Sequence, residues 1–295
     1  MENLSQKQLA LVASTIRVLS AEAIEAAKSG HPGMPLGTAD IGAVLWLKYL
    51  RYNPQNPKWI DRDRFVLSNG HGSMFLYTLL HLAGYNISLD EIKKFRQLGS
   101  LTPGHPEFGH TPGVEATTGP LGQGISNAVG MAIAAKCFEH DYNSEESAIF
   151  NHNIWCMVGD GCLMEGISSE ASSLAGHLKL GNLKVIYDDN HISIAGRTDL
   201  TFSEDVLKRY QAYGWHTIAI DGHDYEAIDN ALSEAISVTD RPTIIAARTI
   251  IGHSSPHKAD SAESHGAPLG TAEVALTKQA LGWPTDAFYV PREVY

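Results

Sequence analysis

The sequence predicts an α/β fold in which helices cover both faces of a parallel sheet. Short apolar runs recur in the second half of the chain, at 153–158, 183–187, 215–220 and 243–247, and helical stretches separate them. The runs are continuously apolar rather than alternating, as expected for strands that are buried on both faces. Strands that alternate with helices favour parallel pairing, because each crossover helix returns the chain to the same edge of the sheet.

The first half of the chain is expected to be mainly helical. Apolar residues repeat at three and four positions from Leu9 onward, Ser5 with Gln8 reads as a capping box, and Gly30 is expected to end this helix. Residues 29–37 contain too many glycines and prolines for a regular element. The remaining elements expected in this half are helices at about 38–50, 72–84 and 88–98, a strand at 64–68 and a long loop at 99–124.

A helix of small residues is expected to follow that loop, from about 125 to 134. Gly130 and Ala132 are interpreted as positions where small side chains let another helix approach closely. Three more helices are expected, at about 165–178, 203–213 and 224–238. Because no repeat or linker marks a boundary, residues 1–295 are expected to form a single domain with a C-terminal tail from about 283 to 295.

Composition excludes several classes of function. The 22 Lys and Arg against 33 Asp and Glu give a net charge of -11, which argues against binding to nucleic acid or to an anionic membrane surface. No apolar stretch approaches the roughly 18 residues of a membrane helix, and the start at Met1 lacks the features of a signal peptide. Three cysteines without a C-x-x-C pair indicate neither a disulfide framework nor a zinc site, so a cytoplasmic protein is expected.

Two polar motifs follow consecutive predicted strands. Asp160 lies between two glycines after the first of these strands, and Asn190 follows the next one. Their carboxylate and amide oxygens, with a nearby backbone carbonyl, are hard donors suited to Mg2+ or Ca2+, and diphosphate oxygens could complete the shell. A helix N-terminus after Asp160 would add N–H groups for phosphate. Either motif alone would be an ordinary turn, but their positions after neighbouring strands favour a metal-diphosphate site.

Histidines provide the second indication of a site. Four of the 14 histidines lie in tight glycine turns from distant parts of the chain: His31, His71, His105 and His265. Together they predict a convergent site where imidazoles exchange protons near neutral pH or bind polar groups of a substrate. Gly119 and Leu121 precede the helix of small residues, and either a flat wall against a planar cofactor ring or ordinary close packing would explain them.

These segments together resemble transketolase, in the family's order and at its spacings. The matching stretches are 29–33, 63–72, 102–107, 117–124, 159–166 and 188–190. The resemblance implies a thiamine diphosphate-binding fold, with thiamine diphosphate and Mg2+ or Ca2+ as cofactors. It also implies transfer of a two-carbon ketol unit from a ketose phosphate to an aldose phosphate, a reaction of carbohydrate metabolism in the pentose phosphate pathway, with the cofactor as electron sink.

The resemblance assigns roles to individual residues. It makes Asp160 and Asn190 side-chain ligands of the metal and the carbonyl of Ile192 a third ligand. It also implies that Gly161 and His71 contact the diphosphate and that Gly119 and Leu121 flank the cofactor. His31, His105 and His265 would face the sugar and take part in catalysis, and His265 would also contact the cofactor. Glu165 would be a carboxylate at the dimer interface.

Two departures from the family bear on function. Ala262 stands where the family usually has the first histidine of G-T-H-x-x-H-G, so the substrate contacts of that loop differ. Transketolases are also more than twice this length, and the resemblance covers only their first domain. The chain is therefore expected to be the N-terminal subunit of a split transketolase, inactive alone and assembled as α2β2 with a C-terminal subunit that carries the pyrimidine-binding domain. The alternative is a fragment of a longer enzyme.

Two other functions are compatible with the sequence. One is a different thiamine diphosphate enzyme, such as a 1-deoxyxylulose-phosphate-type synthase or the α subunit of a 2-oxoacid dehydrogenase. The sugar-facing histidines argue against the dehydrogenase. The other is a non-catalytic module of the same fold, which the presence of every metal-site side chain disfavours.

Overall fold

The computed structural model describes residues 4–295. Residues 1–3 lie outside the described part, and they include the start of the segment in which no signal peptide was expected. A five-stranded sheet forms the centre, in the order β1-β2-β3-β7-β6. Its strands are β1 (Arg64–Leu67), β2 (Ile154–Gly159), β3 (Leu183–Asp189), β6 (His216–Asp221) and β7 (Thr243–Arg248). Every pairing in this sheet is parallel, which confirms the predicted class. A short antiparallel hairpin follows β3, formed by β4 (Ile192–Ser193) and β5 (Gly196–Arg197).

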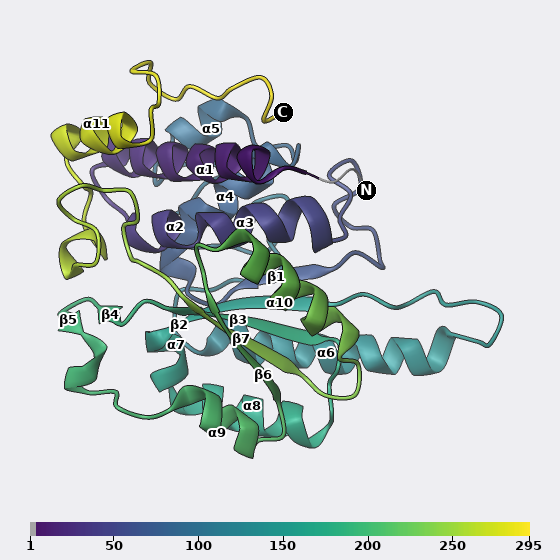
Figure 1. The fold of residues 1–295 in the computed structure, drawn as a ribbon. Helices are drawn as coiled ribbons and strands as arrows, with labels where there is room; N and C mark the ends of the chain where they lie inside the picture. Colours follow the sequence, from purple (N-terminus) through teal and green to yellow (C-terminus); the bar gives the residue numbers. More distant parts are fainter. Residues whose placement is uncertain (1–3) are drawn as a thin grey trace.

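Helices cover both faces of the sheet (Figure 1). One face carries α1 (Gln6–Ala27), α2 (Gly33–Gly37), α3 (Ala39–Val44), α4 (Ser73–Leu82), α5 (Leu89–Lys93) and α10 (Tyr225–Ser237), with α11 (Thr271–Ala280) packed outside α1. The other face carries α6 (Gln123–Tyr142), α8 (Gly166–His177) and α9 (Val206–Ala212), and the short α7 (Asp160–Met164) follows β2 directly. No helix among residues 4–295 is long and apolar enough to cross a membrane.

Successive residues of the central strands belong to two separate cores. On β2, Trp155 and Met157 pack with the helices of the first face, while Cys156 and Val158 pack with those of the second. This alternation is the geometry of a strand, whose side chains point to opposite faces in turn. Because both faces are covered, both sets are apolar, which explains the unbroken hydrophobic runs of the sequence.

Several predicted boundaries are confirmed and others are wrong. Ser5 and Gln8 form the capping box that begins α1, but the helix ends at Ala27, with Lys28 rather than Gly30 as the left-handed cap. The helix expected at 165–178 is confirmed as α8, whose N-cap is Glu165, and the extended backbone of Glu165 separates it from the short α7, which was not predicted. The region at 38–50 is α3 followed by a π-helical turn, and α5 is shorter than predicted.

The glycine-rich segments contain two corrections. Residues 29–37 include the one-turn helix α2, which tolerates Pro35 because the first N–H groups of a helix have no intrahelical partner. Gly130 is not a close-packing position: it is exposed, and a Cβ there would meet no atom within 4 Å. The tightly packed glycine of this helix is Gly124, where a Cβ would lie 2.4 Å from Ser68 Cα. Ala132 is buried, as predicted.

A buried ion pair joins two N-terminal helices, and its carboxylate also contacts residues that follow the edge strand β6. Asp40 on α3 is paired with Arg17 on α1, and both side chains are 4% exposed. Asp40 also accepts hydrogen bonds from the His223 ring at 2.8 Å and from the Tyr225 hydroxyl at 2.6 Å. Burial alone would raise the pKa of Asp40, but these donors hold that pKa well below its usual value.

Replacing Asp40 by Asn is expected to lower the free energy of unfolding by about 3–5 kcal/mol, because Arg17 would be left as an uncompensated buried charge. Urea denaturation followed by circular dichroism measures this change. The matched control is Asp90→Asn, which removes an exposed pair with Lys93 and should change stability by less than about 1 kcal/mol. Equal effects of the two substitutions would contradict a structural role for the buried pair.

Candidate active site

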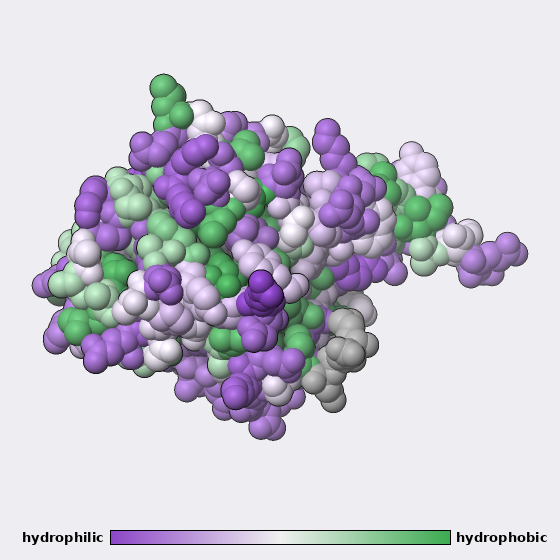
Figure 2. All heavy atoms as spheres, turned by 90° about the horizontal axis from the view of Figure 1, so that it is seen from above, coloured by the Kyte–Doolittle hydropathy of each residue, from purple (hydrophilic) through white to green (hydrophobic). Residues whose placement is uncertain are grey.

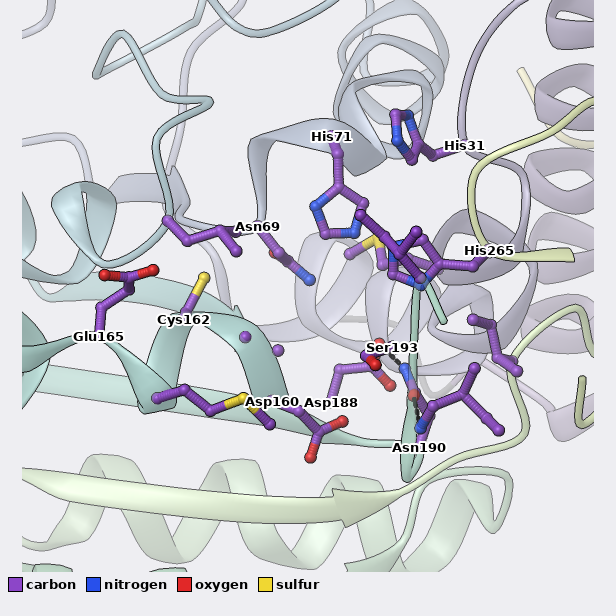
Figure 3. Close-up of a pocket in the computed structure, with 18 of the residues that line it drawn as sticks. His31, Asn69, His71, Asp160, Cys162, Glu165, Asp188, Asn190, Ser193 and His265 are labelled. Carbon is purple, nitrogen blue, oxygen red and sulfur yellow. Dashed lines mark hydrogen bonds between the residues drawn. The ribbon is translucent and has the colours of Figure 1, made fainter. Parts of the chain in front are cut away.

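A cavity of about 470 Å³ opens at the carboxyl ends of β1, β2 and β3 (Figure 3). It is lined by ten of the eleven residues predicted for the site: His31, His71, Gly119, Leu121, Asp160, Gly161, Glu165, Asn190, Ile192 and His265. The exception is His105, which lies directly behind the wall, since a Cβ on Gly119 would be 3.3 Å from its ring. The structure thus brings these residues together, while their individual roles stay predictions.

The register of the sheet sets the floor of this cavity. Gly159 at the end of β2 pairs with Asp188 near the end of β3. Asp160 and Asn190 therefore leave neighbouring strands at the same level, and Figure 3 shows both on one side of the cavity. This is the edge of a parallel sheet where ligands are expected.

Asp160 carries a buried oxygen without a partner. The side chain is 4% exposed, and its Oδ1 accepts the hydroxyl of Tyr187, but its Oδ2 has no hydrogen-bond partner. Burial, together with the nearby carboxylates of Asp188 and Asp189, raises the pKa of Asp160 to about 7, although the hydrogen bond from Tyr187 opposes the shift. A buried carboxylate oxygen that no donor satisfies, in a field of other carboxylates, is suited to a bound cation.

Asn190 presents a second hard oxygen to the same space. Its Oδ1 accepts the backbone N–H of Ile192 at 2.9 Å, and its Nδ2 donates to Asp188 at 2.9 Å. An amide oxygen has two lone pairs, so one remains for a ligand. Together with Asp160 Oδ2, this donor set fits Mg2+ or Ca2+, which prefer carboxylate and carbonyl oxygens.

Three histidines form the opposite wall. The ring centroids of His31 and His71 are 5.1 Å apart, and those of His71 and His265 are 5.2 Å apart. Burial, with the neighbouring His265 ring, lowers the pKa of His31 to about 4 and that of His71 to about 3. Burial also lowers the pKa of His265. At neutral pH these rings are uncharged, so each offers one hydrogen-bond donor and one acceptor.

The unsatisfied buried polar atoms point to a polar ligand. Asp160 Oδ2, Asn69 Oδ1 and His265 Nδ1 all lack partners, and their residues all line this cavity. Because such atoms cost free energy when left unpaired, their convergence favours a bound group that pairs with them. Asn69 was not predicted, although it follows the β1 strand as Asp160 follows β2 and could have been found by the same rule.

Glu165 lies at the end of the cavity away from His31 and His265 (Figure 3). It is exposed in the connection between α7 and α8, beside the exposed apolar side chains of Met164 and Ile167. Leu174 of α8 and Leu178, which follows this helix, are exposed apolar residues as well. This rim therefore combines an apolar surface with a carboxylate.

Other apolar side chains lie on the segment that projects from the molecule at the end of α6 (Figures 1 and 2). Phe138, Tyr142 and Ile149 are exposed there, and the two aromatic rings pack against Phe150. Around this segment Figure 2 shows a surface on which hydrophilic side chains predominate.

Sequence comparison relates the chain to one family. Residues 8–295 match the family described as transketolase, thiamine diphosphate binding domain. The chain is 57% identical over 292 residues to transketolase 1 of Escherichia coli strain K12, covering 99% of this chain and 44% of that protein. It is 58% identical over 287 residues to the transketolase of Geobacillus stearothermophilus, covering 97% of this chain and 43% of the relative. The chain thus spans less than half the length of these relatives.

Solved structures agree with the sequence comparison. Transketolase from Leishmania mexicana matches with a TM-score of 0.96 and 48% identity, over 99% of this chain and 44% of that one. Transketolase from Pichia stipitis, in a complex with sedoheptulose-7-phosphate, matches with a TM-score of 0.95 and 50% identity, over 98% of this chain and 43% of that one.

The histidine wall gives a prediction on pH. His31 and His71 should stay uncharged down to about pH 5. NMR chemical shifts of the imidazole carbons measure their protonation, and the variants His31→Gln and His71→Gln assign the signals. Because their folded pKa values lie below the unfolded value near 6.5, the unfolded state binds more protons on acidification. The contribution of the two uncharged rings to the free energy of unfolding is therefore fully present above about pH 6.5 and is lost as the pH falls toward 4. Titration of both rings near pH 6.5 would contradict this.

Proposed function

The chain belongs to the transketolase family, and from this premise we propose that it is the N-terminal, diphosphate-binding subunit of a two-component transketolase. The enzyme would move a two-carbon ketol unit from a ketose phosphate to an aldose phosphate. The observation that carries the proposal is the single cavity where strand-end oxygens, glycine backbone and three histidines meet. The sugar-phosphate complex of the Pichia stipitis relative supports the substrate class.

The floor of the cavity would hold thiamine diphosphate through a metal ion. Asp160 Oδ2, Asn190 Oδ1 and the Ile192 carbonyl would bind Mg2+ or Ca2+, and diphosphate oxygens would share the ion. The cofactor, when bound, supplies the carbanion and electron sink that no side chain of the chain provides. The net charge of -11 favours such an ion, because an acidic protein offers an anionic ligand little general attraction.

The glycines allow the backbone to approach the cofactor. A Cβ on Gly161 would lie 2.9 Å from a methyl of Leu121, so a larger residue would push into the cavity. Gly161 and His71 would contact the diphosphate, while Gly119 and Leu121 would flank the rings. Gly119 has a φ of 145°, a conformation that side-chain-bearing residues rarely adopt.

The histidines would act on the sugar. His31, His105 and His265 would orient its hydroxyl groups and move protons as the carbon–carbon bond breaks and forms. Burial keeps the pKa of each of these rings below its ordinary value. A neutral imidazole can accept a proton from a hydroxyl group while its second nitrogen donates a hydrogen bond. Ala262 begins the one-turn helix before His265, so this turn carries one imidazole rather than the two that the family usually has.

A partner chain would complete the site. In the relatives this domain is followed by more than half of the protein, so we propose a C-terminal subunit with the pyrimidine-binding domain and an α2β2 assembly in the cytoplasm. The apolar rim around Glu165 supports an interface there, since exposed Met164 and Ile167 would be buried by it. The other thiamine diphosphate reactions and a non-catalytic role have no separate observation in their favour.

Replacing Asp160 by Ala is expected to abolish Mg2+-dependent binding of thiamine diphosphate by the assembled enzyme, because the unpartnered carboxylate oxygen is lost. Isothermal titration calorimetry measures the binding. Asp240→Ala is the control, since this exposed carboxylate precedes β7 at the opposite edge of the sheet. Unchanged binding by the Asp160 variant would show that the metal site is elsewhere.

The purified chain with thiamine diphosphate and Mg2+ should show no ketol transfer, because the proposed partner's pyrimidine-binding domain would supply the other half of the cofactor site. Activity should appear when the partner subunit is added. A coupled assay with xylulose-5-phosphate and ribose-5-phosphate distinguishes the two states. Full turnover without a partner would contradict the two-component proposal, and decarboxylation of pyruvate without ketol transfer would favour the alternative reactions.

A further inference from the structure

Asp188 is a carboxylate that lines the cavity yet has no free oxygen. It is 1% exposed, one of its oxygens accepts the hydroxyl of Thr249, and the other accepts Nδ2 of Asn190 at 2.9 Å. Asp160, on the neighbouring strand, has an oxygen without a partner. The two carboxylates therefore differ in their surroundings: Oδ2 of Asp160 accepts no protein donor, whereas each oxygen of Asp188 is oriented by one.

The contacts of Asn190 leave its amide one orientation. The N–H of Ile192 can only donate, so the atom facing it at 2.9 Å must be the amide oxygen. The amide nitrogen then faces Asp188, whose oxygen accepts. A flipped amide would set oxygen against oxygen at Asp188 and nitrogen against N–H at Ile192, losing both hydrogen bonds in a buried site.

The sheet holds Asp188 in place for this contact. Thr249 directly follows β7, which pairs with β3 so that Arg248 lies opposite Asp189. The N–H of Thr249 donates to the carbonyl of Asp189 at 3.3 Å, which extends the pairing by one residue. Thr249 is 1% exposed, so its hydroxyl has no water to compete with Asp188.

We propose that Asp188 is a positioning residue that fixes the carboxamide of Asn190 with its oxygen toward the metal ion. The inference rests on the proposed function, which makes Asn190 a metal ligand. Figure 3 shows Asp188 and Asn190 side by side on the floor of the cavity, with Asp160 on the adjoining strand end. Without Asp188 only the N–H of Ile192 would orient the amide, so the Asn190 oxygen would face the metal ion for a smaller share of the time. Partners of metal ligands typically contribute about 10–100-fold to metal affinity.

The test is the affinity for Mg2+ of the assembled enzyme in the presence of thiamine diphosphate, measured by calorimetry. Asp188→Leu removes the acceptor and should weaken binding by at least about 10-fold. Asp188→Asn keeps an acceptor oxygen for Asn190 and an N–H for Thr249, so its loss should be smaller. Thr249→Val should weaken binding in the same direction. At saturating Mg2+ the turnover of Asp188→Asn should return close to that of the unmodified enzyme.

The matched control is Asp189→Asn, which removes a neighbouring charge but no contact to Asn190, since Asp189 pairs with His191. Equal losses in the Asp189 and Asp188 variants would overturn positioning in favour of a general effect of negative charge. Unchanged affinity in Asp188→Leu would overturn it outright. If that variant fails to fold, unchanged affinity in both Asp188→Asn and Thr249→Val overturns it. Failure of the unmodified enzyme to bind Mg2+ with the cofactor would instead refute the proposed function.

Discussion

The parallel pairing of β2 with β3 is the constraint on which the rest of the site depends. It places Gly159 opposite Asp188, so the residues that leave the two strands meet at one level. The register is held from both sides, because alternate residues of β2 are buried in two different cores. A shift by one residue would move every side chain to the wrong core. The oxygens at the strand ends therefore occupy a rigid part of the molecule, while the histidines reach the cavity from loops.

Electrostatics separates the two walls of the cavity. The floor carries buried carboxylates, and burial raises the pKa of Asp160 to about 7. The opposite wall carries histidines whose pKa values are lowered by the same cause. Neither wall supplies a fixed positive charge to a diphosphate, so a divalent cation would provide it. This division also explains how a protein with a net charge of -11 can be suited to anionic ligands.

The sequence allowed prediction of those features that depend on local rules. Buried strands, the capping box at Ser5, and polar residues at the ends of consecutive strands follow from periodicity and position, and the reaction class came from the family resemblance. What escaped prediction depends on tertiary contact. The small side chains of α6 do not reveal which face of the helix packs against the rest of the protein. The prediction of close packing at Gly130 was therefore wrong, and Gly124 is the packed glycine. The role of Asp188 depends on Thr249, which is 61 residues away in the chain.

The proposed chemistry depends most on a metal site between the ends of β2 and β3. The most direct measurement is anomalous X-ray diffraction from crystals of the assembled enzyme grown with thiamine diphosphate and Mn2+. The expected result is an anomalous peak bounded by Asp160, Asn190 and the Ile192 carbonyl, with oxygen ligands at about 2.0–2.3 Å. A peak elsewhere, or bound cofactor with no metal between these residues, would contradict it.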